Sequence, residues 1–149
     1  LVVGDMQRMS YRNMFMVICI RQAINYFMGM AALQQGLGRI YRALQDGGKF
    51  IFNAPRYTGQ KRYPSVSHAY THDKLSAFVL EINTLNNRRL RHEQYSVVWG
   101  HRKKPLFVRD ENAFYLFTKN EFNHCLRLAG FRNIQFTESG KTVTCIATK

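Results

Sequence analysis

Cysteine, acidic residues and long apolar runs are all scarce in this chain of 149 residues. The three cysteines lie far apart and form no C-x-x-C pair, which excludes a disulfide-rich secreted framework and the common zinc and redox motifs. The apolar run Met14–Ile20 stops at Arg21, far short of a membrane span, and the first residues do not have the pattern of a signal peptide. We therefore expect reduced cysteines, no membrane partner, and a cytoplasmic location or another reducing intracellular compartment.

The shortage of acids leaves the chain strongly basic. Nine acidic residues stand against 22 lysines and arginines, which gives a formal net charge of +13 and a pI near 10.1. The clusters at 88–91 and 101–104 would attract RNA or another polyanion in a salt-dependent manner. Alternatively, the clusters are solvated turns, or acids elsewhere in a longer protein balance them. No nucleic-acid motif accompanies the charge.

The sequence also lacks the residue sets of hydrolytic and metal-dependent enzymes. Ser65 and Ser67 have no histidine–acid partner at a recognisable spacing. His68 and His72 would share one face at close range only on a helix, whereas the residues between them favour an extended chain. We therefore expect no metal site, and the sequence assigns no catalytic residue.

What is present is an alternation of strand and helix patterns. The continuous apolar segment 15–20 predicts a strand that is buried on both faces of a parallel sheet. Apolar residues spaced by three and four predict a helix from about Met30 to Leu44, which Asp46-Gly47-Gly48 should end. The run 49–53 predicts another strand. This order is typical of an α/β fold with a parallel sheet, in which ligands bind beyond the carboxyl ends of the strands.

The middle of the chain has a different character. Residues 54–67 contain two prolines and a glycine and predict a loop. Strand-like runs at 77–82 and 94–99 flank the turn formers Asn86-Asn87, which predicts an antiparallel hairpin extending from the sheet. The stretch 101–112 is polar.

The final third gives clearer signals. Thr118 and Glu121 have the spacing of a capping box that opens a helix, and Gly130 should end that helix. Runs at 134–137 and 143–147 predict an antiparallel pair of strands.

Several segments, taken in order, match one protein family: Gly4-Asp5-Met6, Phe15–Cys19, Ile40–Phe52, Phe117–Phe122 and Ala129-Gly130-Phe131. Together they resemble the second half of a class I S-adenosylmethionine-dependent methyltransferase. The match is weakest from 54 to 112, and Met16 stands where the family usually has an acid.

The family's glycine-rich loop and its ribose-binding acid have no counterpart in this sequence, because Gly36 and Gly38 lie inside the helical pattern. We therefore expect one N-terminally incomplete domain over residues 1–149. Its fold class is α/β: a partial Rossmann-like methyltransferase sheet without its first strands, with an inserted hairpin over 75–100 and an antiparallel C-terminal hairpin.

The resemblance implies S-adenosylmethionine as the cofactor. It places Asp5 at the adenine amino group and the backbone of Met6 at the ring edge, although Asp5 alternatively caps a turn. It places Ile20, Arg21 and Gln22 beside the methionine part of the cofactor, where Arg21 would pair with the carboxylate. Arg21 is equally well explained as a surface charge at a strand end.

The resemblance also implies an acceptor site. Asn25-Tyr26-Phe27 would enclose it, and Tyr26, Asn53, Arg56 and Tyr57 would face the acceptor, with loop aromatics packed on the sheet edge as the alternative. The implied function is methyl transfer to a small molecule or RNA. The competing hypothesis is a non-catalytic, methyltransferase-derived module in a nucleic-acid-containing assembly.

A partial sheet has consequences for binding and association. We expect this chain alone to bind the cofactor weakly and to be inactive. We also expect it to need a missing N-terminal half, a covering partner chain or self-association, since Val17–Ile20 would form an open apolar edge.

Overall fold

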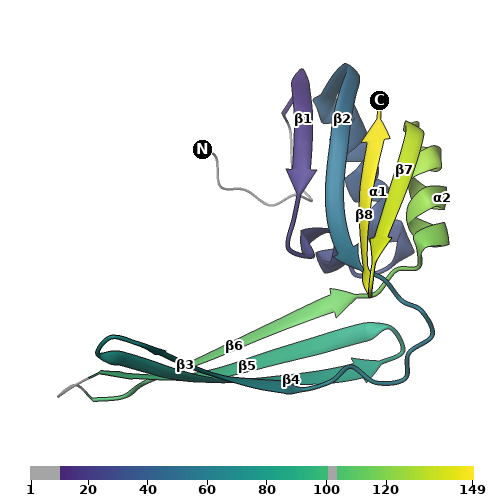
Figure 1. Cartoon of the computed structure of the whole chain (residues 1–149). Helices are drawn as coiled ribbons and strands as arrows, with labels where there is room; N and C mark the ends of the chain where they lie inside the picture. Colours follow the sequence, from purple (N-terminus) through teal and green to yellow (C-terminus); the bar gives the residue numbers. More distant parts are fainter. Residues whose placement is uncertain (1–10, 101–103) are drawn as a thin grey trace. The chain divides into compact units, whose positions relative to one another are not determined.

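The computed structural model describes residues 11–100 and 104–149. The expected strand at 1–4, the cofactor residues Asp5 and Met6, and the basic residues 101–103 lie outside the described residues. The chain divides into two compact units, one formed by residues 1–59 with 115–149 and the other by residues 60–114. Within the described residues, each unit contains one sheet of four strands, in the order β1-β2-β8-β7 or β3-β4-β5-β6 (Figure 1).

The first unit combines a mixed sheet with two helices. Its elements are β1 (Met14–Cys19), the 3-10 helix η2 (Ala23–Tyr26), α1 (Met30–Ala43), β2 (Leu44–Pro55), α2 (Lys119–Ala129), β7 (Arg132–Ser139) and β8 (Thr142–Thr148). Strand β2 pairs in parallel with β1 and antiparallel with β8, and β7 pairs antiparallel with β8. These elements confirm the expected α/β fold with an antiparallel ending.

The core of this unit lies between the sheet and its helices, which cover the same face (Figure 1). Every second residue of β2 from Gly48 to Ala54, and of β8, is buried on that face, including Phe50, Phe52 and Cys145. Helix α1 contributes a buried stripe at its expected three- and four-residue spacings, and Phe122 of α2 packs on Phe52 with ring centroids 5.0 Å apart. Alternating burial is what a sheet covered on one face requires.

The ends of α1 and α2 show which local sequence signals determine where a helix begins or stops. The capping box opens α2 as expected: Thr118 accepts a hydrogen bond from the Glu121 N–H, and the Glu121 carboxylate accepts one from the Thr118 N–H. Gly130 ends the helix with φ 103°. The prediction that Asp46-Gly47-Gly48 ends α1 was wrong, because α1 stops at Ala43 and these residues already belong to β2. The Gly47 N–H donates to the Lys149 carbonyl and the Lys149 N–H donates to the Gly48 carbonyl, and these two bonds hold the glycines in the sheet.

Strand β1 differs from the expectation that it is buried on both faces. Phe15 and Ile18 are 64% and 58% exposed, and only Cys19 is buried. Among the described strands β1 stands at the sheet edge, as the expected open edge requires. Its outward-facing Ile18 continues a row with Ile51 and Ile146 on the face that the described helices leave uncovered.

The second unit is an antiparallel sheet built from β3 (Val66–His72), β4 (Leu75–Asn86), β5 (Arg89–Gly100) and β6 (Leu106–Tyr115). The hairpin of β4 and β5 confirms the expected antiparallel pair, with Asn86 opposite Arg89 at its turn. Two predictions were wrong here: β3 begins at Val66, inside the loop predicted over 54–67, and β6 begins at Leu106, inside the polar stretch predicted over 101–112. The charged side chains of β6 are accommodated because they pair across the strands, as Arg109 does with Glu93 at 2.9 Å.

Candidate functional site

The carboxyl ends of the two parallel strands define the candidate site. In the register of β1 and β2, Cys19 lies opposite Phe52, so Ile20, the first residue after β1, is level with Asn53, which is still paired with Thr144 near the end of β2. The expected cofactor residues 20–22 and the expected acceptor residues 53–57 therefore lie at neighbouring strand ends. Such an edge is where ligands of open α/β sheets bind.

The connection after β1 makes a tight reversal. Arg21 and Gln22 both adopt left-handed backbone conformations, with φ 55° and 66°. Two consecutive left-handed residues other than glycine are uncommon and occur preferentially at ligand-binding positions. The reversal lets the Gln22 carbonyl accept the Asn25 N–H at 2.8 Å and leaves the side chains of Ile20, Arg21 and Gln22 exposed. They are therefore accessible for contact with a ligand.

Asn25 connects the chain reversal after β1 to the last residues of β2 and β6 through hydrogen bonds. Its side chain is fully buried, and its Nδ2 donates to the carbonyl oxygen of Tyr115 at 2.7 Å and to that of Pro55 at 3.4 Å. Its Oδ1 has no hydrogen-bond partner within the described part of the chain. The sequence analysis placed Asn25 among the residues that enclose the acceptor site but did not predict its anchoring role. No sequence pattern distinguishes an asparagine whose side chain is buried from one that is exposed.

A glycine in α1 holds the same connection from the other side. The buried Phe27 ring lies directly over Gly36, and a Cβ at that position would collide with the ring. Gly36 therefore acts through packing and not through a phosphate-binding loop. Tyr26, between the two buried residues Asn25 and Phe27, is 43% exposed and remains on the accessible side.

The residues at the end of β2 and directly after it divide into two kinds. Asn53 is half-buried, and its Oδ1 has no partner in the described residues. Arg56 instead forms an ion pair with Glu138, NH1 to Oε2 at 2.6 Å. The backbone N–H groups of Arg56 and Tyr57 donate to Lys141 and Phe117 respectively, so this segment is held in place on both sides.

Glu138 is the main electrostatic partner of this edge. Lys119 donates to its carboxylate at 2.9 Å, and this hydrogen bond, with the charge of Arg56, holds the pKa of Glu138 below its usual value against the opposing effect of burial. Because the Arg56 guanidinium is already engaged, its contribution to the site is to fix the chain after β2. The structure thus gives Arg56 a supporting place among the expected acceptor residues.

The cysteines and histidines offer little additional chemistry. Burial raises the pKa of Cys19 to about 11 and that of Cys145 to about 12, so both thiols stay protonated at neutral pH. His68 and His72 lie on the extended strand β3, as expected, and His72 pairs with Asp73 at 3.3 Å. Within residues 11–100 and 104–149, no group of three metal-binding side chains comes together.

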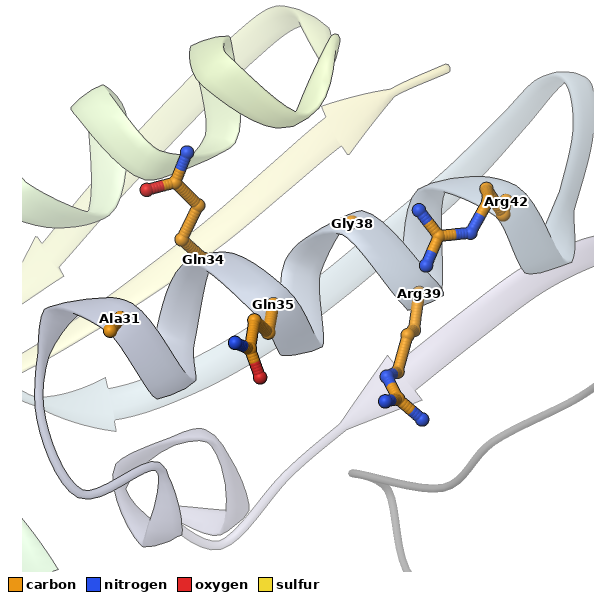
Figure 2. A pocket seen from close by; sticks show the side chains of 6 residues that line it. All are labelled: Ala31, Gln34, Gln35, Gly38, Arg39 and Arg42. Atoms are coloured by element: carbon orange, nitrogen blue, oxygen red, sulfur yellow. The ribbon is translucent and has the colours of Figure 1, made fainter.

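A shallow hollow of about 430 Å³ lies on the polar face of α1. Figure 2 shows its lining by Gln35, Arg39 and Arg42 beside the small residues Ala31 and Gly38. It contains none of the expected site residues, and all of its walls come from one helix. The strand ends, not this hollow, therefore remain the candidate site.

No protein-family profile matches the sequence. A segment of 70 residues is 29% identical to nodulation protein S of Rhizobium tropici, covering 47% of this chain and 29% of that protein. In the part of the chain that the structure describes, no helix has the length and apolar character needed to cross a membrane.

Solved structures match almost the whole chain. DesVI of Streptomyces venezuelae superposes with a TM-score of 0.87 at 16% identity over 97% of this chain and 62% of its own. The sugar N-methyltransferase KedS8 from Streptoalloteichus superposes with a TM-score of 0.85 at 15% identity, over 98% of this chain and 60% of its own. CalS10 is an amino pentose methyltransferase from Micromonospora echinaspora whose structure contains bound S-adenosylmethionine. It superposes with a TM-score of 0.79 at 17% identity, over 97% of this chain and 62% of its own.

The chain spans about 60% of the length of these structures. Its sheet order, the loop after β1 and the inserted antiparallel unit are all contained in the matched region. The chain therefore has the fold of the C-terminal part of a class I, Rossmann-like, S-adenosylmethionine-dependent methyltransferase.

Proposed function

We propose that this chain forms the acceptor-side part of an S-adenosylmethionine-dependent methyltransferase that methylates an amino group of a small hydroxylated molecule, such as an amino sugar. One observation carries the proposal: the left-handed pair Arg21-Gln22 follows β1, and the half-buried Asn53 lies near the end of the neighbouring parallel strand β2, at the same sheet edge. The names of KedS8 and CalS10, which describe sugar and amino pentose methyltransferases, support the choice of acceptor.

The proposed roles follow from what each side chain offers. Arg21 is exposed at a strand end and supplies a cation for the cofactor carboxylate, while Ile20 and Gln22 line the methionine part. Asp5 and Met6 retain their proposed places at the adenine ring. Asn53, with an unpartnered carboxamide oxygen, accepts a hydrogen bond from an acceptor hydroxyl or amine.

The acceptor pocket is completed by aromatic residues. Tyr26 and Tyr57 supply its walls, while the engaged Arg56 positions the chain that carries Tyr57. An aromatic wall with a few polar groups is the usual composition of a small-molecule site.

The chemistry requires positioning more than acid–base assistance. A neutral amine attacks the methyl carbon of the sulfonium, the carbon–sulfur bond breaks, and a neutral thioether leaves. The methylated ammonium then returns a proton to water. Alignment of donor and acceptor supplies much of the acceleration for such a step, so a proton-transferring triad is not required.

The test uses the longest polypeptide that carries this sequence and measures transfer of a labelled methyl group to a panel of amino sugars, neutral sugars and short RNAs. We expect the amino sugars to be methylated. Asn53→Ala should raise KM for the acceptor about tenfold, the loss of one good hydrogen bond. Arg21→Ala should instead raise the Kd for the cofactor.

The exposed Asn120 on α2 provides the matched control, since Asn120→Ala should leave both constants unchanged. Transfer to RNA alone, or equal effects of the Asn53 and Asn120 variants, would contradict the proposed acceptor site.

A further inference from the structure

The first unit has very few acidic residues at the end of its sheet that lies opposite the candidate site. The sequence contains no aspartate or glutamate from 6 to 45. Glu121 is held in the capping box of α2, and Glu138 pairs with Arg56 at the end that carries the candidate site. Of the described acids of this unit, only Asp46 lies near the opposite end, where its side chain is fully exposed. Cations at that end are therefore scarcely neutralised.

Two of these cations lie on the face of the first sheet that the described helices leave uncovered. Lys49 of β2 is paired with Thr148 of β8, and Thr148 is paired with Arg132 of β7. The chain neighbours Phe50 and Ala147 are buried on the helix face. Alternation along the strands therefore directs the Lys49 and Arg132 side chains to the other face, where both are exposed.

Three further cations lie on the helices. Arg39 and Arg42 line the hollow on α1 (Figure 2), and Arg127 occupies the last turn of α2. The two helices meet at these ends, because the Tyr41 ring of α1 packs edge-on against Phe131, just after α2, with centroids 5.2 Å apart. The cations of both helices thus belong to the same end of the unit.

Helix dipoles explain only part of this charge. A cation near the last turn stabilises a helix, and Lys149 already serves the end of α1 in this way. Its ammonium donates to the Leu44 carbonyl at 2.7 Å and lies 5.0 Å from the centroid of the Tyr41 ring. Arg39 precedes the last turn, and within the described residues neither Arg39 nor Arg42 has a carboxylate at ion-pair distance. Both guanidinium groups are therefore available to an external anion.

We propose that this end of the first unit binds the phosphate backbone of single-stranded RNA. We call it the basic end: Arg39, Arg42, Lys49, Arg127 and Arg132. Four of these five cations are arginines, whose planar guanidinium groups bind phosphate oxygens bidentately. The set continues from the helices round the end of the sheet to its uncovered face. A flexible single strand can follow such a path, whereas a stiff duplex cannot. The proposal is independent of the methyltransferase activity.

The basic clusters expected from the sequence are less suited to this role. Arg91 is engaged with Glu111 at 2.8 Å and with Glu93 at 3.4 Å, and residues 101–103 lie outside the described residues. A polyanion binds through cations that it can neutralise, and these carboxylates already neutralise Arg91. The exposed Arg89 at the hairpin turn provides a control for charge alone.

The test measures the binding of a fluorescein-labelled oligouridine to the whole chain by fluorescence anisotropy at several salt concentrations. If each of the five cations contacts one phosphate, the logarithm of the binding constant should fall with that of the salt concentration at a slope of about −3.5, or roughly 0.7 per contact. Arg42→Glu combined with Arg127→Glu should reduce this slope by about 1.4 and weaken binding at least ~25-fold at about 0.1 M salt.

The matched control combines Arg62→Glu with Arg89→Glu. It makes the same change in net charge at two exposed positions of the second unit and should leave the slope unchanged. Circular dichroism checks that the variants fold. Because a reversed charge in a last turn opposes the helix dipole, Arg42→Gln combined with Arg127→Gln provides a second pair that removes the contacts without reversing the charge.

Three results would overturn the proposal. The first is that the folded chain does not bind oligouridine at low salt, or binds it with an affinity that salt does not change. The second is an equal loss of affinity in the basic-end pair and the control pair, which assigns binding to overall charge. The third is tighter binding of polyglutamate than of oligouridine, which assigns the basic end to an acidic protein segment.

Discussion

The two sheets of this chain have the same number of strands but opposite relations to a core. The first is covered on one face by α1 and α2, and its alternate residues on that face are fully buried. The second has residues of the same type, β-branched and aromatic, yet only Leu90 and Phe114 are buried among those described. Strand formation therefore does not by itself produce a core, which requires a second layer.

The largest test of this comparison truncates one phenylalanine in each sheet. Phe52→Ala removes a fully buried ring in contact with Phe50 and Phe122 and should lower the free energy of unfolding by about 3–5 kcal/mol. Phe78→Ala, at a side chain that is 42% exposed, should cost less than about 1 kcal/mol. Urea denaturation at low protein concentration measures both. Equal losses would mean that the second sheet has a core of its own.

Two glycines of α1 allow the same comparison between a buried and an open position, with a change of only one methyl group. Gly36→Ala would push a Cβ into the Phe27 ring and should destabilise the protein by about 1–3 kcal/mol. Gly38→Ala meets only the Arg42 side chain, at 3.7 Å, and should stabilise by up to ~1 kcal/mol through helix propensity. Thermal unfolding of the pair is the measurement. A neutral Gly36→Ala would show that Phe27 can leave this contact freely.

Two asparagines compare buried with exposed hydrogen bonds. Asn25→Ala leaves the carbonyls of Tyr115 and Pro55 without their buried donor and should cost about 1–3 kcal/mol. Asn83 makes similar bonds, to the Pro64 carbonyl at 2.7 Å and to His92 Nδ1 at 2.9 Å, but on an accessible sheet. Water replaces these bonds, so Asn83→Ala should cost below about 0.5 kcal/mol. A larger loss of stability for Asn83→Ala than for Asn25→Ala would contradict the conclusion that Asn25, and not Asn83, belongs to a buried core.

The smallest expected effects concern the two ion-pair networks. Hydrogen bonds from Lys119 and Arg109 lower the pKa of Glu138 and Glu93 respectively below the ordinary 4.5. A lowered carboxyl pKa stabilises the folded chain above pH 4.5, and this contribution disappears as the pH falls through the folded-state value. Glu138→Gln and Glu93→Gln should therefore lower Tm at pH 7 and converge on the wild type in stronger acid. A difference from the wild type that grows on acidification would contradict these pairings.

Much of the fold could be predicted because its signals are local. The capping box of Thr118 and Glu121, the stop at Gly130 and the periodicity of α1 each involve residues within a few positions of one another. The start of β3 and the whole of β6 were not predicted, because the stability of these strands comes from partners across the sheet. Arg109 and Glu111 look like a polar loop until Glu93 and Arg91 are placed beside them.

The candidate site divides in the same way. The positions of Arg21 and Gln22 follow from where β1 ends, which the sequence indicates, whereas β2 continues to Pro55, two residues beyond the predicted end at Asn53. The anchoring by Asn25 joins residues up to 90 positions apart, and the Phe27–Gly36 contact depends on how the chain returns across the helix. No local pattern encodes such contacts. The engaged state of Arg56 was likewise hidden, since its partner Glu138 lies far along the chain.

The two junctions of the inserted unit have a consequence for how this chain can vary in length. Arg56 forms a parallel bridge with Phe117, and Tyr57 donates to the same residue, so the chain leaves and re-enters the first unit at one place. Closing a loop between ends that already touch becomes only slightly harder as the loop grows. Residues 60–114 can therefore be lengthened, shortened or exchanged for another folded module with little effect on how the first unit folds.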